Sequence, residues 1–327
     1  MASPLVSVVI PVFNTGASAK VLAEKFARDD YENLEILLID DGSTDDSLKL
    51  LKALKDPKIK VFSKENGGPS SARNFGLEKS KGKYLFFIDS DDDADANFIS
   101  KLVSEKEKKN VALVSSGYLY HRLSDDSKSL VSCKPFKKKK NESKKSFVLR
   151  ALLSGRLYAV NNKVFDAETI RKNNLRFDES LSFAEDTKFV LDYLSKAEGE
   201  ILFVPEPLYI YNFGTETSIV SSANGIWENW EKSFKNVKAW VGKNPSLREK
   251  LLLRLLRLRW RVSCLRSKGG RKGAPRLFPL LFRFITLKNS FRNASIRLNS
   301  KPIKILKFFL LMMVRPTVRS DFLKLTS

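Results

Sequence analysis

The first part of this 327-residue sequence alternates short apolar runs with segments of helical periodicity. Apolar runs rich in β-branched residues predict strands, and the stretches between them are long enough for helices. The predicted strands cover residues 6–10, 35–40, 59–63, 84–89 and 111–116, and the predicted helices cover residues 17–29, 45–54, 70–79 and 97–108. Strands that alternate with helices in this way form a mostly parallel sheet with helices on both faces. The sequence therefore predicts an α/β fold.

Residues 124–146 interrupt this alternation, because they are polar and rich in lysine. Such a composition favours an exposed connection over a core element. Helical patterns return at residues 147–154, 166–172 and 184–196, and an extended run covers residues 201–213. From Trp227 onward the sequence is helical and basic, with a Gly- and Pro-rich break at residues 268–275.

Positive charge is concentrated at the C-terminal end of the sequence. Of a net charge of +22, nearly all comes from residues 226–327, which hold 25 of the 59 Lys and Arg residues, four of the 37 acidic residues and all four tryptophans. Helices that mix Trp and Phe with basic residues are typical of segments that lie in the headgroup layer of an anionic membrane. The alternative is an amphipathic bundle that packs on the rest of the protein and exposes a basic face. Nucleic-acid binding is not expected, because no known DNA- or RNA-binding module is recognisable.

Several classes of protein are disfavoured by what the sequence lacks. Cys133 and Cys264 are too few and too far apart for a disulfide framework or a cysteine-rich metal site. His121 is the only histidine, which excludes a histidine-rich metal site. The N-terminal residues do not resemble a signal peptide, and no apolar run approaches the ~20 residues of a membrane-spanning helix. We therefore expect a cytoplasmic protein that associates peripherally with the inner face of the cell membrane.

Acidic residues cluster where two predicted strands end. Residues 40, 41 and 45 follow the second strand and residues 89, 91, 92 and 93 follow the fourth, and all seven are aspartates. Ligands of open α/β sheets bind at the carboxyl ends of the strands. Carboxylates gathered there favour a hard divalent cation such as Mg²⁺ or Mn²⁺. Because the Gly-rich phosphate-binding loops of dinucleotide-binding proteins and P-loop proteins are absent, a metal would have to neutralise any bound phosphate.

Six segments, taken in order, resemble the successive motifs of glycosyltransferase family 2. They are VVIPVFN (8–14), LIDDGSTDDS (38–47), NGGPSSARNFGL (66–77), YLFFIDSDD (84–92), NNKVF (161–165) and AED (184–186). The resemblance covers roughly the first 215 residues and implies a GT-A fold, which is Rossmann-like. It implies a catalytic domain at residues 1–225, with a nucleotide-binding half at 1–120 and an acceptor-side half at 147–225, followed by a basic α-helical region at 226–327.

The resemblance also implies a donor site. Asp41 is the expected contact to uracil, with Pro11 and Asn14 lining the same pocket, and Arg73 lies near the nucleotide. Asp91 is the expected principal metal ligand, Asp89 lies nearer the ribose and also contacts the metal, and Asp92 is a second metal contact. The expected cofactor is Mn²⁺ or Mg²⁺. A divalent ion at this place would neutralise the charge that grows on a diphosphate leaving group.

The expected catalytic base is Asp186, in the Glu185-Asp186 pair that opens a predicted helix. By resemblance this carboxylate takes the proton of the acceptor hydroxyl, and Glu185 helps to position it. An alternative explanation is that both residues only favour a helix N-terminus. Attack would be a single in-line displacement with inversion at the anomeric carbon. The Gln-x-x-Arg-Trp element of processive family members is absent, which favours the addition of one sugar per encounter.

These features together predict an inverting, metal-dependent hexosyl- or N-acetylhexosaminyltransferase (class EC 2.4). The expected donor is a UDP-sugar, and the expected acceptor is a hydroxyl of a glycan or lipid-linked molecule in cell-surface polysaccharide biosynthesis. Two alternatives have other functions. A non-catalytic nucleotide-sugar or membrane-binding scaffold would not need an intact Asp89, Asp91 and Asp186, and a nucleotidyltransferase would carry a Gly-rich basic loop after the first strand.

Overall fold

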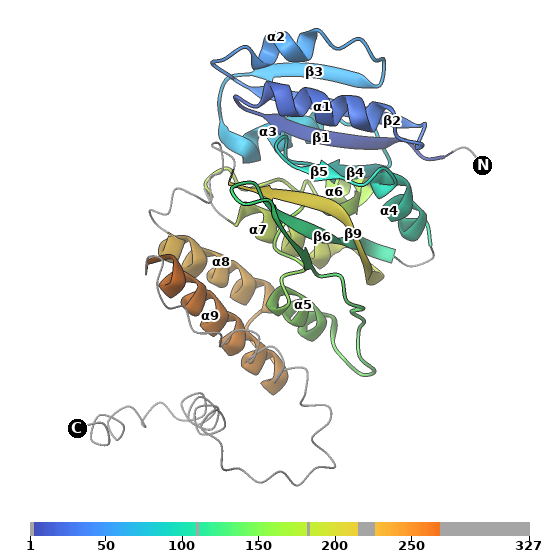
Figure 1. Ribbon diagram of the computed structural model, residues 1–327. Coiled ribbons are helices and arrows are strands. Elements are labelled where there is room, and N and C mark those ends of the chain that lie inside the picture. Colours follow the sequence, from blue (N-terminus) through green and yellow to red (C-terminus); the bar gives the residue numbers. More distant parts are fainter. Residues whose placement is uncertain (1–2, 109–110, 182–183, 215–225, 269–327) are drawn as a thin grey trace. The chain divides into compact units, whose positions relative to one another are not determined.

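The computed structural model describes residues 3–108, 111–181, 184–214 and 226–268 (Figure 1). The chain divides into two compact units, Met1–Arg261 and Val262–Ser327, and the elements discussed below lie in the first unit, except that the last helix extends past its end. Up to the fourth helix the elements are β1 (Val6–Val12), α1 (Gly16–Ala27), β2 (Leu34–Asp41), α2 (Ser47–Lys52), β3 (Ile59–Lys64), α3 (Gly68–Lys79), β4 (Tyr84–Phe87), β5 (Asp93–Ala94) and α4 (Phe98–Lys106). The remaining elements are β6 (Val111–Arg122), β7 (Ser127–Val131), α5 (Lys144–Leu153), β8 (Lys163–Asp166), α6 (Ala167–Lys172), α7 (Glu185–Lys196), β9 (Glu200–Phe213), α8 (Ile226–Val241) and α9 (Leu247–Lys268).

The described strands form one sheet in the order β3-β2-β1-β4-β8-β6-β9-β5, with β7 paired to β6. The β1–β4 half is parallel as predicted, because each strand there is followed by a crossover helix. The expectation of a mostly parallel sheet is nevertheless wrong for the whole. β8 runs antiparallel to both β4 and β6, and β5 and β7 are also antiparallel to their partners. The fold is therefore α/β with a mixed sheet.

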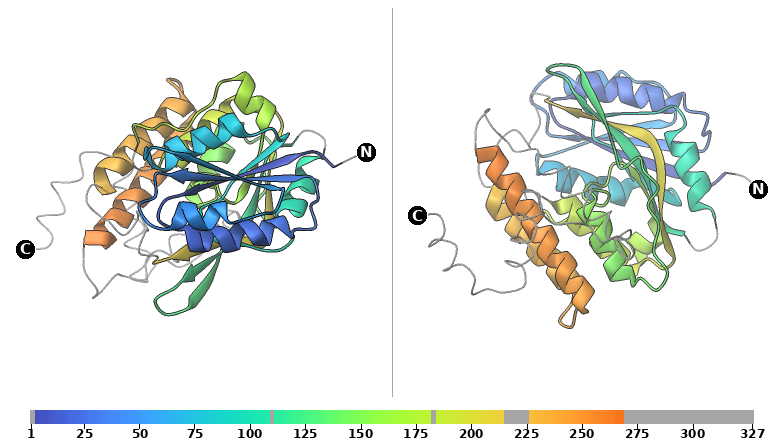
Figure 2. Two further views of the ribbon diagram at one scale, coloured as in Figure 1. Left: turned by 90° about the horizontal axis from the view of Figure 1, so that it is seen from above. Right: turned by 60° about the horizontal axis from the view of Figure 1, so that its bottom comes forward.

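Helices lie on both faces of the sheet (Figure 2), and alternating strand residues enter two separate cores. Val8 and Ile10 of β1 pack with apolar residues of α1 and α4, whereas Val9 packs with residues of α3 and α5–α7. This is the period of two that a strand covered on both faces requires. The prediction of helices on both faces is thus confirmed. α3 packs closely on β1, since a Cβ built on Gly76 would lie 2.3 Å from Cγ1 of Val9.

The polar segment 124–146 contains more structure than expected. Residues 127–131 form β7, which pairs with β6. Glu142 is buried, and its carboxylate accepts hydrogen bonds from Arg150 and Arg248. The prediction of an exposed connection is confirmed for β7, a strand with four exposed residues out of five, and is wrong for Glu142, whose buried carboxylate pairs with Arg150 and Arg248. Residues 137–140, all lysines, are exposed as expected.

α8 and the first part of α9 pack on the domain that precedes them. Val237, Val241, Leu253 and Leu256 are buried in the core that contains α7, whereas Arg254 and other basic residues of α9 are exposed. This part of the expected basic region is therefore a packed pair of helices with a solvated basic face, and the compact unit extends past residue 225 to Arg261. Residues 269–327 lie outside the described part of the chain. No helix within the described ranges is both long and apolar enough to cross a membrane.

Candidate functional site

A cavity of about 720 Å³ opens at the carboxyl ends of β1, β2 and β4, between the start of α7 and the strand β9. The open α/β topology places ligands at this edge. All eight residues expected to form the site line this cavity: Pro11, Asn14, Asp41, Arg73, Asp89, Asp91, Asp92 and Asp186. Glu185 lines it as well. The structure therefore brings together residues from both halves of the domain.

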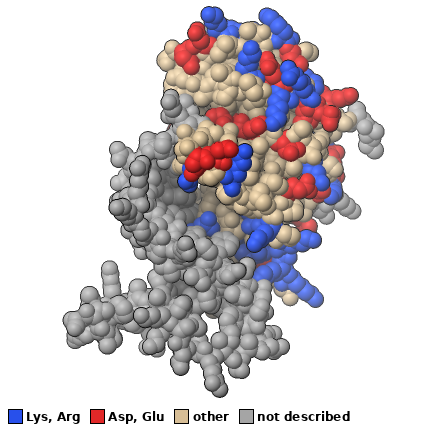
Figure 3. Space-filling view, in the orientation of Figure 1, with Lys and Arg blue, Asp and Glu red and all other residues tan. Residues whose placement is uncertain are grey.

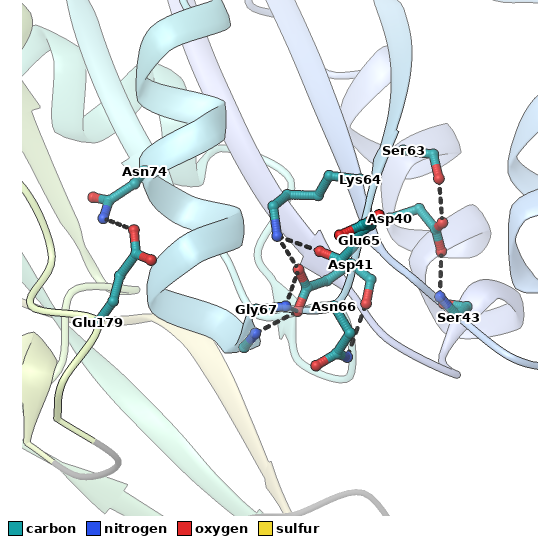
Figure 4. Close-up of polar contacts among 11 residues, drawn as sticks. Asp40, Asp41, Ser43, Ser63, Lys64, Glu65, Asn66, Gly67, Asn74 and Glu179 are labelled. Atoms are coloured by element: carbon teal, nitrogen blue, oxygen red, sulfur yellow. Dashed lines mark hydrogen bonds and ion pairs between the residues drawn. The ribbon is translucent and has the colours of Figure 1, made fainter.

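Asp41 organises the loop at one end of the cavity (Figure 4). Its buried carboxylate accepts hydrogen bonds from Lys64 Nζ at 2.8 Å, from the Gly68 N–H at 2.7 Å and from the Gly67 N–H at 3.1 Å. The Asn66 side chain donates to the backbone carbonyl of Asp41. Backbone donors that satisfy a carboxylate hold it in one orientation. Asp41 is thus fixed before any ligand arrives.

Asn14 connects the end of β1 to the turn after β2. Its N–H donates to Ser43 Oγ at 3.0 Å, and its Oδ1 accepts the Thr44 N–H at 2.9 Å. Its backbone has φ of 53°, in the left-handed region that asparagine tolerates better than most residues. The turns after β1 and β2 therefore form one rigid wall of the cavity.

The turn after β4 presents three aspartates whose surroundings differ. Both Asp92 oxygens accept protein hydrogen bonds, from Tyr209 and from the Asn212 N–H. Burial, followed by the charge of Asp89, raises the pKa of Asp92 well above its ordinary value. Asp91 lines the cavity, and its backbone carbonyl accepts a hydrogen bond from the Asn212 amide. The turn is thus anchored to β9 through Asp92.

The donor set of this turn suits a hard cation, although it is not a complete metal site. Among the residues that the structure describes, no three His, Cys, Asp or Glu side chains are grouped to hold a metal by themselves. Burial raises the pKa of Tyr211 in the cavity wall, and the charges of Asp92, Asp89 and Asp91 raise it further. Carboxylate oxygens and a negative field match Mg²⁺ or Mn²⁺, for which bound phosphates commonly supply further ligands. The residues therefore fit such an ion when a diphosphate is present.

Arg73 lies at the centre of the carboxylates. Its side chain is 5% exposed, and it lies 2.7 Å from Asp89, 3.4 Å from Asp186 and 3.5 Å from Glu185. Burial alone would lower the pKa of Arg73, but the three carboxylates together raise it. The guanidinium also stacks 5.5 Å from the centre of the Phe177 ring. The arginine is thus a buried counter-ion within the cavity wall.

Asp186 lies in the first turn of α7 and does not cap the helix. The residue before the helix is Ala184, with φ of 61°, and it makes no side-chain cap. Asp186 Oδ2 accepts the Val160 N–H at 3.2 Å, whereas its buried Oδ1 accepts no hydrogen bond. Burial raises the pKa of Asp186 to about 7, against the lowering effect of Arg73. A carboxylate with a pKa near neutrality and an unused lone pair is suited to accept a proton.

Sequence reasoning missed several polar residues that support the site. Asn161 donates to both Asp89 and Asp92 at 3.3 Å, and Tyr209 holds Asp92. Lys163 is fully buried, its Nζ donates to Asn162 Oδ1 at 2.7 Å, and burial lowers its pKa to about 7 although Asp186 opposes this. The NNKVF segment was a usable signal for the first and third of these residues. Tyr209 gave no local signal, because it lies 117 residues from its partner.

Comparison with known proteins gives consistent matches. The sequence profile described as "Glycosyl transferase family 2" matches residues 7–165. An uncharacterised glycosyltransferase of Haemophilus influenzae is 30% identical over 249 residues, 75% of this chain and 93% of that protein. The uncharacterised glycosyltransferase EpsJ of Bacillus subtilis is 30% identical over 214 residues, 64% of this chain, and this match spans only 61% of that protein's length.

A relative with a more specific description is the GalNAc(5)-diNAcBac-PP-undecaprenol beta-1,3-glucosyltransferase of Campylobacter jejuni. It is 28% identical over 225 residues, which is 68% of this chain and 69% of that protein. Its acceptor, by its name, is a lipid-linked glycan.

Solved structures with lower sequence identity share the fold. TarS of S. aureus (residues 1–349), solved in complex with UDP-GlcNAc, superposes with a TM-score of 0.59 and 20% identity, over 80% of this chain and 71% of that chain. The mannosyltransferase PcManGT of Pyrobaculum calidifontis, solved with GDP-Man and Mn²⁺, gives a TM-score of 0.56 and 16% identity, over 94% of this chain and 84% of that chain. Both structures confirm the expected GT-A-like architecture.

Proposed function

The chain belongs to glycosyltransferase family 2, and on that premise we propose that it transfers a sugar, with inversion, from a UDP-sugar to a hydroxyl of a glycan or lipid-linked acceptor. The observation that carries this proposal is that residues from separate motifs line one cavity. Asp41, Asp89 and Asp91 come from the first half of the domain, and Asp186 comes from the second half.

The nucleoside end of the cavity is proposed to lie beside Asp41, Pro11 and Asn14. These residues form the rigid wall after β1 and β2, where Lys64 and two backbone N–H groups donate hydrogen bonds to the Asp41 carboxylate. The preference for a UDP-sugar is supported by the UDP-GlcNAc bound to TarS, which shares this fold.

The diphosphate end of the cavity is proposed to lie at the turn after β4. Asp91 and Asp89 would hold Mn²⁺ or Mg²⁺, which neutralises charge on a departing diphosphate. The Mn²⁺ found with GDP-Man in PcManGT supports a divalent ion in this fold. Tyr209 and Asn212 of β9 donate to the two oxygens of Asp92 and so anchor the turn. The oxygens of Asp89 also accept hydrogen bonds, from Arg73 and Asn161, so Asp91 is the proposed principal ligand.

The base is proposed to be Asp186. Its Oδ1 lacks a hydrogen bond and therefore has a lone pair for the acceptor hydroxyl, while Oδ2 is held by Val160. As the hydroxyl oxygen attacks the anomeric carbon, its proton passes to Oδ1 and the bond to the diphosphate breaks. One displacement of this kind inverts the anomeric configuration.

A lipid-linked or glycan acceptor at an anionic membrane surface is proposed from two observations. The Campylobacter relative is named for a polyprenyl-linked substrate. On the face seen in Figure 3, basic side chains gather at the lower edge of the described surface, and α9 exposes further basic residues. Segments 137–140 and 250–257 would then face anionic headgroups, with residues 269–327 adding further basic charge.

The proposal is tested by UDP release from a panel of UDP-sugars, with a membrane extract as acceptor and with Mn²⁺, Mg²⁺ or EDTA present. We expect release with one donor, dependent on the cation. Asp186→Asn should lower kcat by about 100-fold or more. Asp192→Asn is the matched control, because it makes the same change two turns along the same helix, where Asp192 pairs with Lys188 and does not line the cavity. Binding of UDP without release from any donor would instead indicate a non-catalytic scaffold.

A further inference from the structure

One guanidinium connects the two ends of the proposed reaction. Arg73 Nη2 lies 2.7 Å from Asp89 Oδ1, at the diphosphate end of the cavity. Its Nη1 lies 3.4 Å from Asp186 Oδ1 and 3.5 Å from Glu185 Oε1, at the end where the acceptor is attacked. Arg73 belongs to α3, Asp89 follows β4, and the other two carboxylates open α7. Three elements from both halves of the domain therefore meet on one side chain.

The two terminal nitrogens of Arg73 make different contacts. Nη2 donates a short, charge-assisted hydrogen bond to Asp89. Nη1 is close enough to Asp186 for an ion pair but makes no hydrogen bond to it, so Asp186 Oδ1 is buried without a donor. The positive charge thus acts on this oxygen while its lone pair stays unused. That combination suits an atom that must remain ionised and still accept a proton.

The other charges that face Asp186 cannot replace Arg73. Asp89 and Glu185 are negative, and together with burial they favour protonation of Asp186. Lys163 of β8 is the other cation near it, but burial lowers the pKa of this lysine to about 7, so that it loses its charge near neutral pH. An arginine keeps its proton under all these conditions. Among the described residues, Arg73 is therefore the permanent counter-charge of Asp186.

We propose that Arg73 is a positioning residue for the base: its charge favours the ionised form of Asp186, and its two terminal nitrogens tie the position of that carboxylate to Asp89. This inference rests on the proposed function, in which Asp186 accepts the proton of the acceptor. It differs from the role expected by family resemblance, a contact to the nucleotide. Both terminal nitrogens of the buried guanidinium contact carboxylates and its face lies over Phe177, while its Nε is buried without a hydrogen-bond partner.

The experiment compares Arg73→Met and Arg73→Lys with the wild type. It measures the pH dependence of kcat for UDP release, with the active donor and membrane extract, and the affinity for UDP with Mn²⁺ by calorimetry. In Arg73→Met we expect the acid limb of the profile to move up by about one pH unit or more, since a nearby unit charge is lost. At pH 7, kcat should fall about 10-fold or more, while UDP affinity falls no more than about three-fold.

Arg73→Lys retains the charge but not the planar fork, and one ammonium cannot reach both Asp89 and Asp186 in the same way. We expect its acid limb to stay within about 0.3 pH units of wild type while kcat falls about 10-fold. If Arg73→Met does not fold, Arg73→Lys tests the proposal by itself. Wild-type kcat in Arg73→Lys would overturn the proposal.

Arg171→Met is the matched control for loss of a structural arginine. Arg171 donates to the backbone carbonyls of Ser80 and Gly82, away from the cavity. Its loss should lower the melting temperature without moving the acid limb. An unmoved limb in Arg73→Met, together with a ten-fold loss of UDP affinity, would show Arg73 to be a nucleotide ligand. Failure of the proposed function is separate, because Asp186→Asn would then keep wild-type kcat whatever the Arg73 variants do.

Discussion

The hydroxyl of Tyr209 on β9 donates a 2.5 Å hydrogen bond to Oδ2 of Asp92. The N–H of Asn212 holds the other oxygen of the same carboxylate at 2.9 Å. Both Asp91 and Asp92 line the cavity, and both oxygens of Asp92 accept hydrogen bonds from β9. The contacts of Asp92 anchor this turn to β9, and in the proposed function Asp91 is the principal metal ligand.

Asp91→Ala and Asp92→Asn should consequently fail in different ways. We expect Asp91→Ala to reduce cation-dependent UDP release about 100-fold with little change in stability, because it removes a proposed metal ligand. Asp92→Asn should lower the free energy of unfolding by about 1–3 kcal/mol, since it disturbs buried hydrogen bonds, and should keep the cation requirement. Urea denaturation and titration of release with Mn²⁺ measure both effects. Unchanged cation dependence in Asp91→Ala would remove the basis for the metal site.

The contribution of Asp186 to the stability of the unliganded protein should fall as the pH rises from about 4 to about 7. Burial raises the pKa of Asp186 from its ordinary value of 3.8 to about 7, so the folded protein keeps a proton that the unfolded chain has released. Asp186→Asn removes the free-energy cost of ionising this buried carboxyl group at high pH. At pH 8 it should be more stable than wild type, by on the order of 1–3 kcal/mol, and at pH 4 the two should agree. Urea unfolding at both pH values tests this, and a variant no more stable at pH 8 than at pH 4, relative to wild type, would contradict it.

Asp41→Asn should weaken both nucleotide binding and the fold. The substitution removes the ion pair with Lys64 and can place an amide NH₂ against the Gly67 and Gly68 N–H groups. We expect the free energy of unfolding to fall by about 1–3 kcal/mol and UDP affinity to fall about 10-fold or more. Lys64→Met is the control, because it removes the cation and leaves both backbone hydrogen bonds; its effect should be smaller. Calorimetry with UDP measures the affinity, and wild-type binding by Asp41→Asn would exclude it from the nucleoside site.

Gly76→Ala should destabilise the protein although alanine favours helices. A Cβ at this position would lie 2.3 Å from Val9 Cγ1, so α3 could no longer approach β1 as closely. Overpacking of this kind costs about 1–3 kcal/mol, which outweighs the ~1 kcal/mol gain in helix propensity. The double variant Gly76→Ala/Val9→Ala makes room for the new methyl group. In a denaturation series it should lose less stability than the two single variants added together; simple additivity would rule out the contact as the cause.

The parallel half of the fold could be predicted because each of its strands has a local apolar pattern and each is followed by a helix. The strands missed were β5, β7 and β8, with two, five and four residues. Such short segments have no readable period, and their partners along the sheet stabilise them. The mixed topology follows from these three strands, which is why the sequence indicated a mostly parallel sheet.

The site was predictable to the extent that topology places strand ends together. Asp41, Asp89 and Asp91 each follow a predicted strand, so their convergence could be inferred. The burial of Arg73 could not be, because an arginine within a predicted helix is most often exposed, and its three carboxylate partners come from distant parts of the chain. The hydrogen bonds from Tyr209 and Asn212 of β9 to Asp92 could not be predicted either, because these residues are also distant in the sequence.

The position of β8 in the sheet has a consequence for biosynthesis. Lys163–Asp166 lies between β4 and β6, although the ribosome makes it after both. Until residue 166 has left the exit tunnel, β4 has no neighbour on one side and offers the free backbone groups of an edge strand. An abortive product that stops at residue 120 would therefore expose the edge of β4, a site suited to intermolecular pairing.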